Sequence, residues 1–170
     1  MILVGLGSNR GDSAATLTRA MTALEAYAAG GFRRSSLWRT SPVDCPPESG
    51  EFCNAAVAFE ARPTLSPEIL LYRLKALERA FGRGPVLVRN APRELDLDLL
   101  LFDDEQRDSD RFTLPHPRAC ERRFVLAPAA EVAPEARWPG TTKTVAELLA
   151  ALRSDEQVER LCDAGVGGDP

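Results

Sequence analysis

Two aspartates one residue apart, Asp96 and Asp98, are the side chains in this sequence best suited to chemistry. They alternate with leucines in the run 94–102, a pattern typical of a strand in the middle of a sheet. Residues two apart in a strand point to the same face, so the carboxylates are expected side by side, about 6.5 Å apart. Two such charges repel each other, and a divalent cation such as Mg²⁺ would compensate them. The alternative is the solvated face of an amphipathic strand.

Arginines surround this pair in the sequence. Planar guanidinium groups suit phosphate oxygens, so the cluster predicts a polyphosphate held together with metal. The alternative is that some of them pair with surface acids, which we expect for Arg118 and Arg123. The arginines are Arg83, Arg89 and Arg93 before the pair, and Arg111, Arg118, Arg122 and Arg123 after it.

His116 is the only histidine and lies between Pro115 and Pro117. A lone histidine is often structural, but next to the arginines it is a candidate donor to phosphate. Gly5, Gly7 and Gly11 have neither the dinucleotide-binding spacing nor the lysine of a P-loop. A serine nucleophile is also excluded, because the sequence has no G-x-S-x-G motif.

Hydrophobic periodicity predicts the elements that must position these groups. Their order is β-α-β-β-α-β, the split βαβ arrangement of an α+β protein with an antiparallel sheet and helices packed on it. A helix near 122–127 and a last helix starting at Thr144 are C-terminal additions. We expect one domain over 1–162 and a frayed Gly-rich tail over 163–170. The expected strands are 2–6, 32–40, 52–60 and 94–102, and the expected helices are 13–28, ended by Gly30 and Gly31, and 66–81.

The local sequence also predicts helix caps and strand faces. Asp12 or Ser13 is the expected cap of the first helix, Ser66 the cap of the second, and Thr144 the start of a capping box in the last. Alternation in the strand 52–60 puts Ala55, Val57 and Phe59 on one face and Asn54, Ala56 and Ala58 on the other.

Composition limits the possible classes of protein. The net charge of −4 argues against general nucleic-acid binding. The four cysteines form no C-x-x-C pair, which favours a reduced cytoplasmic protein with cysteines as buried small hydrophobes. No run approaches the roughly 20 apolar residues of a membrane span, and no signal peptide is expected.

Six short motifs occur in an order that resembles the 6-hydroxymethyl-7,8-dihydropterin pyrophosphokinase family, an enzyme family of folate biosynthesis. The resemblance covers about residues 3–134. The motifs are Gly7-Ser8-Asn9, Phe52-Cys53-Asn54-Ala55, Gly82-Arg83, Pro92-Arg93-Glu94-Leu95-Asp96-Leu97-Asp98, Pro115-His116-Pro117 and Arg122-Arg123-Phe124-Val125-Leu126.

The resemblance implies a ferredoxin-like core and transfer of pyrophosphate from ATP to the pterin hydroxymethyl group, with release of AMP. It implies two Mg²⁺ ions on Asp96 and Asp98, and catalytic roles for these two residues, Arg83 and Arg93. The small-molecule substrates would bind to a monomer. The implied pterin contacts are Thr40, Pro42, Val43, Phe52, Asn54 and Phe124, and the implied ATP contacts are Glu78, Arg83, Arg93, Leu99, Arg111, Thr113, His116 and Arg122.

The sequence departs from the family pattern in its loops. Asn90-Ala91 replaces the usual Trp-Gly, so the aromatic lid is missing or comes from another residue. Gly84-Pro85 stands where a second arginine is common, and residues 44–50 lack the usual Asp-Gln-Pro. Two other readings remain: a different two-metal phosphotransferase or nucleotidyl-cleaving enzyme, and a ferredoxin-like RNA-binding or ligand-sensing module.

Overall fold

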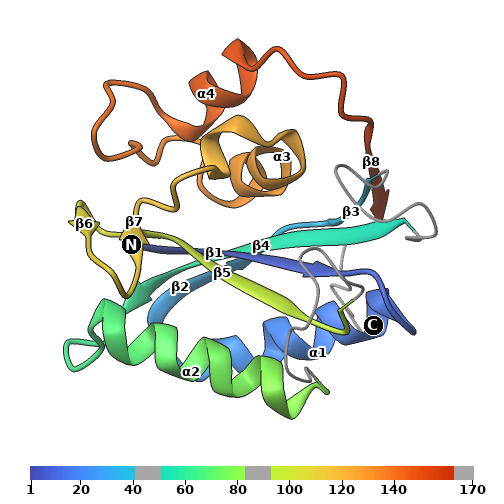
Figure 1. The fold of residues 1–170 in the computed structure, drawn as a ribbon, viewed down its shortest axis with the longest axis horizontal. Coiled ribbons are helices and arrows are strands. Elements are labelled where there is room, and N and C mark those ends of the chain that lie inside the picture. The colour runs from blue at the N-terminus through green and yellow to red at the C-terminus, as the bar shows by residue number, and fades with distance from the viewer. Residues whose placement is uncertain (41–50, 83–92, 163–170) are drawn as a thin grey trace, which may run out of the picture.

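We describe residues 1–40, 51–82 and 93–162 in a computed structural model of the chain. Their order follows the predicted β-α-β-β-α-β core, except that the second predicted strand is divided in two, and C-terminal additions follow (Figure 1). The elements are β1 (Ile2–Ser8), α1 (Ser13–Glu25), β2 (Ala28–Arg34), β3 (Leu37–Thr40), β4 (Phe52–Ala61), α2 (Pro67–Ala80), β5 (Asp96–Phe102), β6 (Arg107–Asp108), β7 (Thr113–Leu114), the 3₁₀ turn η1 (Ala119–Glu121), α3 (Arg123–Val132), α4 (Val145–Ala151) and β8 (Val158–Cys162).

The main sheet has the order β5-β1-β4-β3-β8, with β2 also paired to β4, and every pairing is antiparallel. Strand β4 is central, and its side chains alternate between the two faces of the sheet, as the sequence predicted. Its residues Ala55, Val57 and Phe59 face one hydrophobic cluster, whereas Ala56 and Ala58 face another. Both faces of the sheet are therefore covered.

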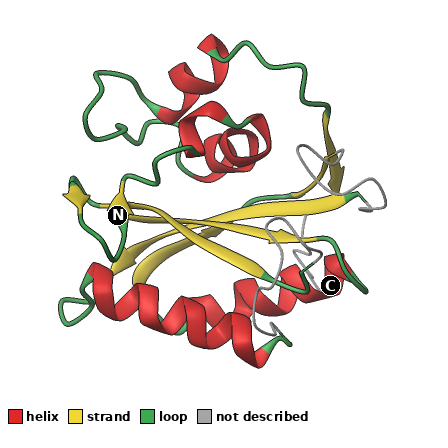
Figure 2. Ribbon diagram, viewed as in Figure 1, coloured by secondary structure: helices red, strands yellow, loops and turns green. Residues whose placement is uncertain are grey.

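Helices α1 and α2 cover one face of the sheet, and α3 and α4 lie over the other (Figures 1 and 2). The predicted caps form: Asp12 accepts a hydrogen bond at the start of α1, and Ser66 does so before Pro67 in α2. Alanines at the centre of β4 leave room for α3, whose Leu126 and Ala129 are fully buried there. The carboxylates described below lie on the α3 side, whereas the pocket beside them is also lined by residues of α2.

Three predictions about local structure were wrong. The single strand expected over 32–40 is two strands, because the buried Ser35 interrupts the ladder and its hydroxyl accepts from the Ala56 N–H at 2.8 Å. Helix α1 ends at Glu25, and Gly30 and Gly31 lie within β2, at irregular points of its register with β4. Strand β5 is at the edge of the sheet, not in its middle. The run of leucines is explained by helices that cover both faces of β5. It does not indicate neighbouring strands at both of its edges.

The C-terminal part adds a strand that the sequence did not predict. Strand β8 pairs with β3, and Glu131 of α3 joins the two strands. The Glu131 carboxylate accepts from the Ser36 N–H at 3.0 Å, from the Trp38 indole at 2.9 Å and from Arg160 at 2.9 Å. Helix α4 begins with the expected Thr144 capping box. One sheet thus includes residues from Ile2 to Cys162.

None of the helices in the described ranges has the length and apolar character needed to cross a membrane. Cys53 is a buried free thiol, as expected for a small hydrophobe, and Cys120 is partly buried. The tail over 163–170 lies outside the described residues.

Candidate active site

Asp96 and Asp98 begin β5 and share one face of it, as predicted. Leu95 and Leu97 are completely buried on the opposite face, in the cluster with α1 and α2. Burial raises the pKa of Asp98 above its ordinary value, and the neighbouring Asp96 carboxylate raises it further. The site therefore places one partly desolvated carboxylate beside another. Such a pair is costly until a cation approaches it.

The register of three strands places glycines next to these aspartates. Gly7 of β1 pairs with Asp96 on one side and with Asn54 of β4 on the other. Gly5 occupies the equivalent place between Asp98 and Ala56. Paired residues of neighbouring strands point to the same face, so no side chain stands between Asp96 and Asn54. The two strand spacings leave roughly 10 Å between their backbones.

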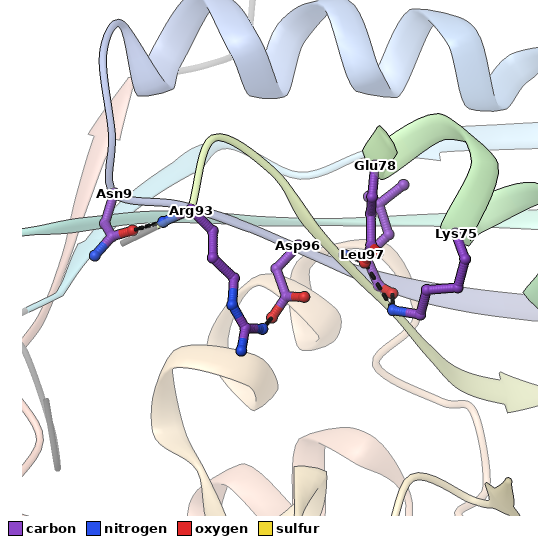
Figure 3. Close-up of polar contacts among 6 residues, drawn as sticks. All are labelled: Asn9, Lys75, Glu78, Arg93, Asp96 and Leu97. Carbon is purple, nitrogen blue, oxygen red and sulfur yellow. Dashed lines mark hydrogen bonds and ion pairs between the residues drawn. The ribbon is translucent and has the colours of Figure 1, made fainter. Parts of the chain in front are cut away.

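Arg93 is held at the entrance to β5 by its backbone. Its N–H donates to Asn9 Oδ1 at 2.7 Å, and its carbonyl accepts from the Asn9 N–H at 3.1 Å. Its guanidinium then reaches Asp96, with 2.9 Å between Nη1 and Oδ2 (Figure 3). The predicted phosphate-binding arginine therefore lies directly against a predicted metal ligand.

A pocket of about 210 Å³ opens beside Asp98. Among the residues predicted to contact ATP, Leu99, Thr113 and His116 line it. The His116 backbone is fixed by a hydrogen bond from its N–H to the Leu100 carbonyl, 3.1 Å long. Its Nδ1 atom is buried and, among the described residues, lacks a hydrogen-bond partner. A buried polar atom of this kind is expected at a ligand site. The lining is Leu71, Lys75, Asp98, Leu99, Phe112, Thr113, His116 and Pro117.

The residues predicted for the pterin come from the sheet and from α3. Asn54 is buried, and its Nδ2 donates to the Thr40 hydroxyl at 2.9 Å. Phe52 pairs with Thr40 and is two residues before Asn54, so it belongs to the same face of β4. Phe124 is in the first turn of α3, on the helical layer that covers this face. Pro42 and Val43 lie outside the described residues, as do Arg83, Asn90 and Ala91.

The predicted arginines that follow the Asp pair in the sequence differ in their exposure and in their contacts. Arg111 is exposed, and Arg122 lies 3.8 Å from Glu156 and 6.0 Å from the centre of the Phe124 ring. Glu156 also accepts from the Arg123 N–H at 2.6 Å, and so caps α3 from the C-terminal segment. We expected Arg118 and Arg123 to form ion pairs with surface acids. Among the described residues neither does, so this prediction was wrong. The Arg123 guanidinium instead turns to the Leu152 carbonyl.

Sequence reasoning missed several neighbours of the site. Lys75 lines the pocket and reaches β5 from α2, while Asn9 fixes Arg93. Asn9 lies within a quoted motif, but only the tertiary structure reveals its partner. The Gly5-x-Gly7 spacing was compared only with nucleotide-binding loops, and both of these were excluded. Its period of two in a strand is the signal that would have placed both glycines on one face.

The donor set suits magnesium bound together with a phosphate ligand. In the described ranges, no group of three or more His, Cys, Asp or Glu side chains is arranged to hold a metal ion. Mg²⁺ commonly takes only one or two protein carboxylates and completes its shell with substrate phosphates and water. Asp96 and Asp98 provide such a pair, and Asp98 lines the neighbouring pocket.

A ferredoxin-like α+β sheet carries the Asp96–Asp98 pair on one strand, with Arg93 paired to Asp96 and with Asp98 and His116 lining one pocket. This combination defines a class of protein suited to metal-bound phosphate ligands. Comparison with known proteins gives the particular family. The chain belongs to the 7,8-dihydro-6-hydroxymethylpterin-pyrophosphokinase (HPPK) family, whose model matches residues 3–134. Members of this family are pyrophosphokinases of folate biosynthesis, a class of transferase.

Similar proteins include two bacterial 2-amino-4-hydroxy-6-hydroxymethyldihydropteridine pyrophosphokinases. The Synechocystis protein is 40% identical over 86% of this chain and 73% of its own length. The Bacillus subtilis protein is 38% identical over 82% of this chain and 81% of its own. A crystal structure of a Plasmodium falciparum HPPK-DHPS triple mutant with pteroate has a TM-score of 0.65 at 14% identity. It matches 88% of this chain, which spans 42% of that longer chain, and it supports the fold.

Proposed function

We propose that this chain transfers a pyrophosphoryl group from ATP to the hydroxymethyl group of 6-hydroxymethyl-7,8-dihydropterin and releases AMP. The main observation that supports this proposal is the row of paired residues Asp96, Gly7 and Asn54 across three neighbouring strands. It aligns a carboxylate suited to metal and phosphate with an amide suited to the edge of a heteroaromatic ring. Only a glycine lies between them. The proposal includes a monomer that acts on small molecules in the cytoplasm, without nucleic acid or membrane as a partner.

In the proposed reaction, the pterin hydroxyl oxygen attacks the β-phosphorus of ATP. The bond from that phosphorus to the bridging oxygen of the α-phosphate breaks, AMP leaves, and the hydroxyl proton is lost. Two Mg²⁺ ions, held by Asp96 and Asp98, would neutralise phosphate charge and align the reacting groups. Asp98 or Asp96 is a candidate acceptor for the proton, although metal coordination is an alternative way to make the hydroxyl acidic.

The protein's own groups would position both substrates. Arg93 is already aimed at Asp96 and would share its charge between that carboxylate and a phosphate. In the pocket, His116 and Thr113 offer polar atoms to phosphate or ribose, and Leu99 offers an apolar surface to the adenine. Arg83, Arg111 and Arg122 stay predicted ATP contacts.

Two aromatic rings and one amide would bind the pterin. Phe52 from the sheet and Phe124 from the helical layer provide apolar faces on opposite sides of the ring. The Asn54 side chain, oriented by Thr40, would read the ring edge. Pro42 and Val43 complete the predicted pterin contacts.

The reaction products test the proposal. The protein is incubated with Mg-ATP and 6-hydroxymethyl-7,8-dihydropterin, and nucleotides and pterins are separated by chromatography. We expect AMP and pterin diphosphate in equal amounts, and no AMP without the pterin or with excess EDTA. Accumulation of ADP with a pterin monophosphate would instead identify an ordinary kinase and overturn the proposal.

A further inference from the structure

The outer edge of β5 has no neighbouring strand, yet its middle residue has hydrogen-bond partners. Leu97 pairs with Leu6 of β1, and β5 ends the sheet on that side. In an antiparallel strand, the N–H and C=O of one residue point to the same side. For Leu97 this side faces α2. Its backbone groups would otherwise be left without partners in a buried position, because Leu97 is completely buried.

Two side chains of α2 provide these partners. Glu78 Oε1 accepts from the Leu97 N–H at 2.8 Å, and Lys75 Nζ donates to the Leu97 carbonyl at 3.0 Å. The two side chains also pair with each other, with 2.7 Å between Nζ and Oε1 (Figure 3). We call this closed set of three contacts, made by Lys75, Glu78 and the Leu97 backbone, the α2 clamp. It replaces a missing strand at a single residue.

The position of the clamp suggests its purpose. Leu97 is the residue between Asp96 and Asp98, so the orientation of its two peptide groups sets the directions of both carboxylates. Glu78 is 1% exposed and is not among the residues that line the nucleotide pocket. Helix α2 packs against β5, and its buried Leu74 belongs to the same hydrophobic cluster as Leu97, which gives the clamp a rigid base.

We propose that Glu78, together with Lys75, is a positioning residue that fixes the spacing of the Asp96 and Asp98 carboxylates for a divalent cation. The inference rests on the proposed function in one respect, because it takes these aspartates to be the metal ligands. It differs from the family-based prediction that Glu78 contacts ATP. Residues that support metal ligands typically change metal affinity by roughly 10–100-fold when they are removed.

The test measures metal binding without turnover. Mn²⁺ replaces Mg²⁺ and is followed by its electron paramagnetic resonance signal, in the presence of α,β-methylene-ATP, whose bridging carbon prevents pyrophosphoryl transfer. We expect Glu78→Ala to weaken Mn²⁺ binding by about 10-fold or more, and Glu78→Gln, which keeps an acceptor oxygen, to recover most of the affinity. Glu68→Gln removes the same negative charge from an exposed position on α2. This control variant should bind Mn²⁺ as tightly as wild type.

Two further measurements separate positioning from direct contact. Calorimetry with the analogue and no metal should give the same affinity for wild type and Glu78→Ala, whereas a direct ATP contact predicts a loss here. Hydrogen exchange at the Leu97 amide should become faster in Glu78→Ala. If Glu78→Ala does not fold, Lys75→Met carries the test, with a smaller expected loss of Mn²⁺ affinity and faster exchange.

The outcomes distinguish this inference from the proposed function. Wild-type Mn²⁺ affinity in a folded Glu78→Ala variant, or in Lys75→Met where that variant carries the test, overturns the clamp alone. A wild-type protein that binds no Mn²⁺ with the nucleotide analogue overturns both proposals. Equal losses in Glu78→Ala and Glu78→Gln, with weaker binding of the metal-free analogue, would assign Glu78 to the nucleotide and also overturn the clamp.

Discussion

Asp96 and Asn54 occupy one row of the sheet, on strands separated only by β1, and both pair with Gly7. A Cβ atom on Gly7 would lie 3.3 Å from Asn54 Oδ1, which is tighter than ordinary packing. The absence of a side chain at this position therefore keeps the face open between the two residues. The proposed reaction joins their ligands in that space.

Gly7→Ala should impair catalysis more than it impairs folding. The added methyl group must displace the Asn54 amide from Thr40 or narrow the floor of the site. We expect kcat/KM for the pterin to fall by about 10-fold or more, in line with the cost of a small misplacement of reacting groups. Gly30→Ala is the control, because its Cβ would meet Glu60 at an ordinary 3.6 Å in β2. Equal activity of the two variants would contradict this role of Gly7.

Asp98→Asn should abolish turnover and stabilise the metal-free protein at neutral pH. The folded-state pKa of Asp98 is raised, chiefly by burial, so the folded protein binds the proton more tightly than the unfolded chain. Stability therefore falls as pH rises from the unfolded-state pKa of about 3.9 through the raised folded-state pKa. The asparagine avoids that loss.

Thermal unfolding in EDTA checks the sign of this effect. The melting temperature of Asp98→Asn should exceed that of wild type at pH 7, and the gap should shrink as the pH is lowered toward 4. An Asp98→Asn variant that is less stable than wild type at pH 7 would show that the ionised Asp98 does not destabilise the folded protein.

Asp96→Ala and Asp98→Ala should both remain folded and inactive, even at saturating Mg²⁺.

Arg93→Ala should lower kcat on the order of 10³-fold if its guanidinium stabilises the transferred phosphates as an arginine finger does. Its ion pair with Asp96 and its backbone link to Asn9 fix the direction of the side chain. Arg107→Ala removes an exposed arginine paired with Glu105 and should leave kcat nearly unchanged. Rapid-quench measurement of AMP separates chemistry from product release. A loss confined to KM would make Arg93 a binding residue only.

Glu156→Ala should destabilise the protein by about 1 kcal/mol, the usual cost of losing a helix N-cap. Arg122, at the N-cap position of α3, makes no side-chain cap. Glu156 instead accepts from the N–H of Arg123, 33 residues away in the sequence. Chemical denaturation measures the effect, with Asp155→Ala, a change at the exposed neighbouring residue, as control.

Because Arg122 and Phe124 are at this end of α3, we also expect Glu156→Ala to raise KM for both substrates. A stable variant with unchanged KM would remove Glu156 from this role.

Local patterns were sufficient to predict much of the fold and the centre of the site. The leucine–aspartate alternation placed Asp96 and Asp98 on one face, and the caps at Asp12, Ser66 and Thr144 formed as expected. Each of these signals lies within a few residues of its effect. The alternation in β4 likewise predicted which of its residues enter each hydrophobic cluster.

The errors concern relations between distant segments. The edge position of β5, the interruption at Ser35 and the addition of β8 all depend on which strands pair, and periodicity does not specify partners. Lys75 and Glu78 are ordinary polar residues of an amphipathic helix until α2 lies beside Leu97. The Glu156 cap and the acid partner of Arg122 also required the C-terminal segment to be in place.

The Glu131 junction has a practical consequence for shortened forms of this chain. The family match ends at residue 134, so a fragment cut there would lack α4, β8 and the Arg160 partner of Glu131. Strand β3 would then become an open sheet edge, a template for pairing between molecules. Such a fragment should retain the chemical groups of the site and yet aggregate at concentrations where the full chain remains dispersed.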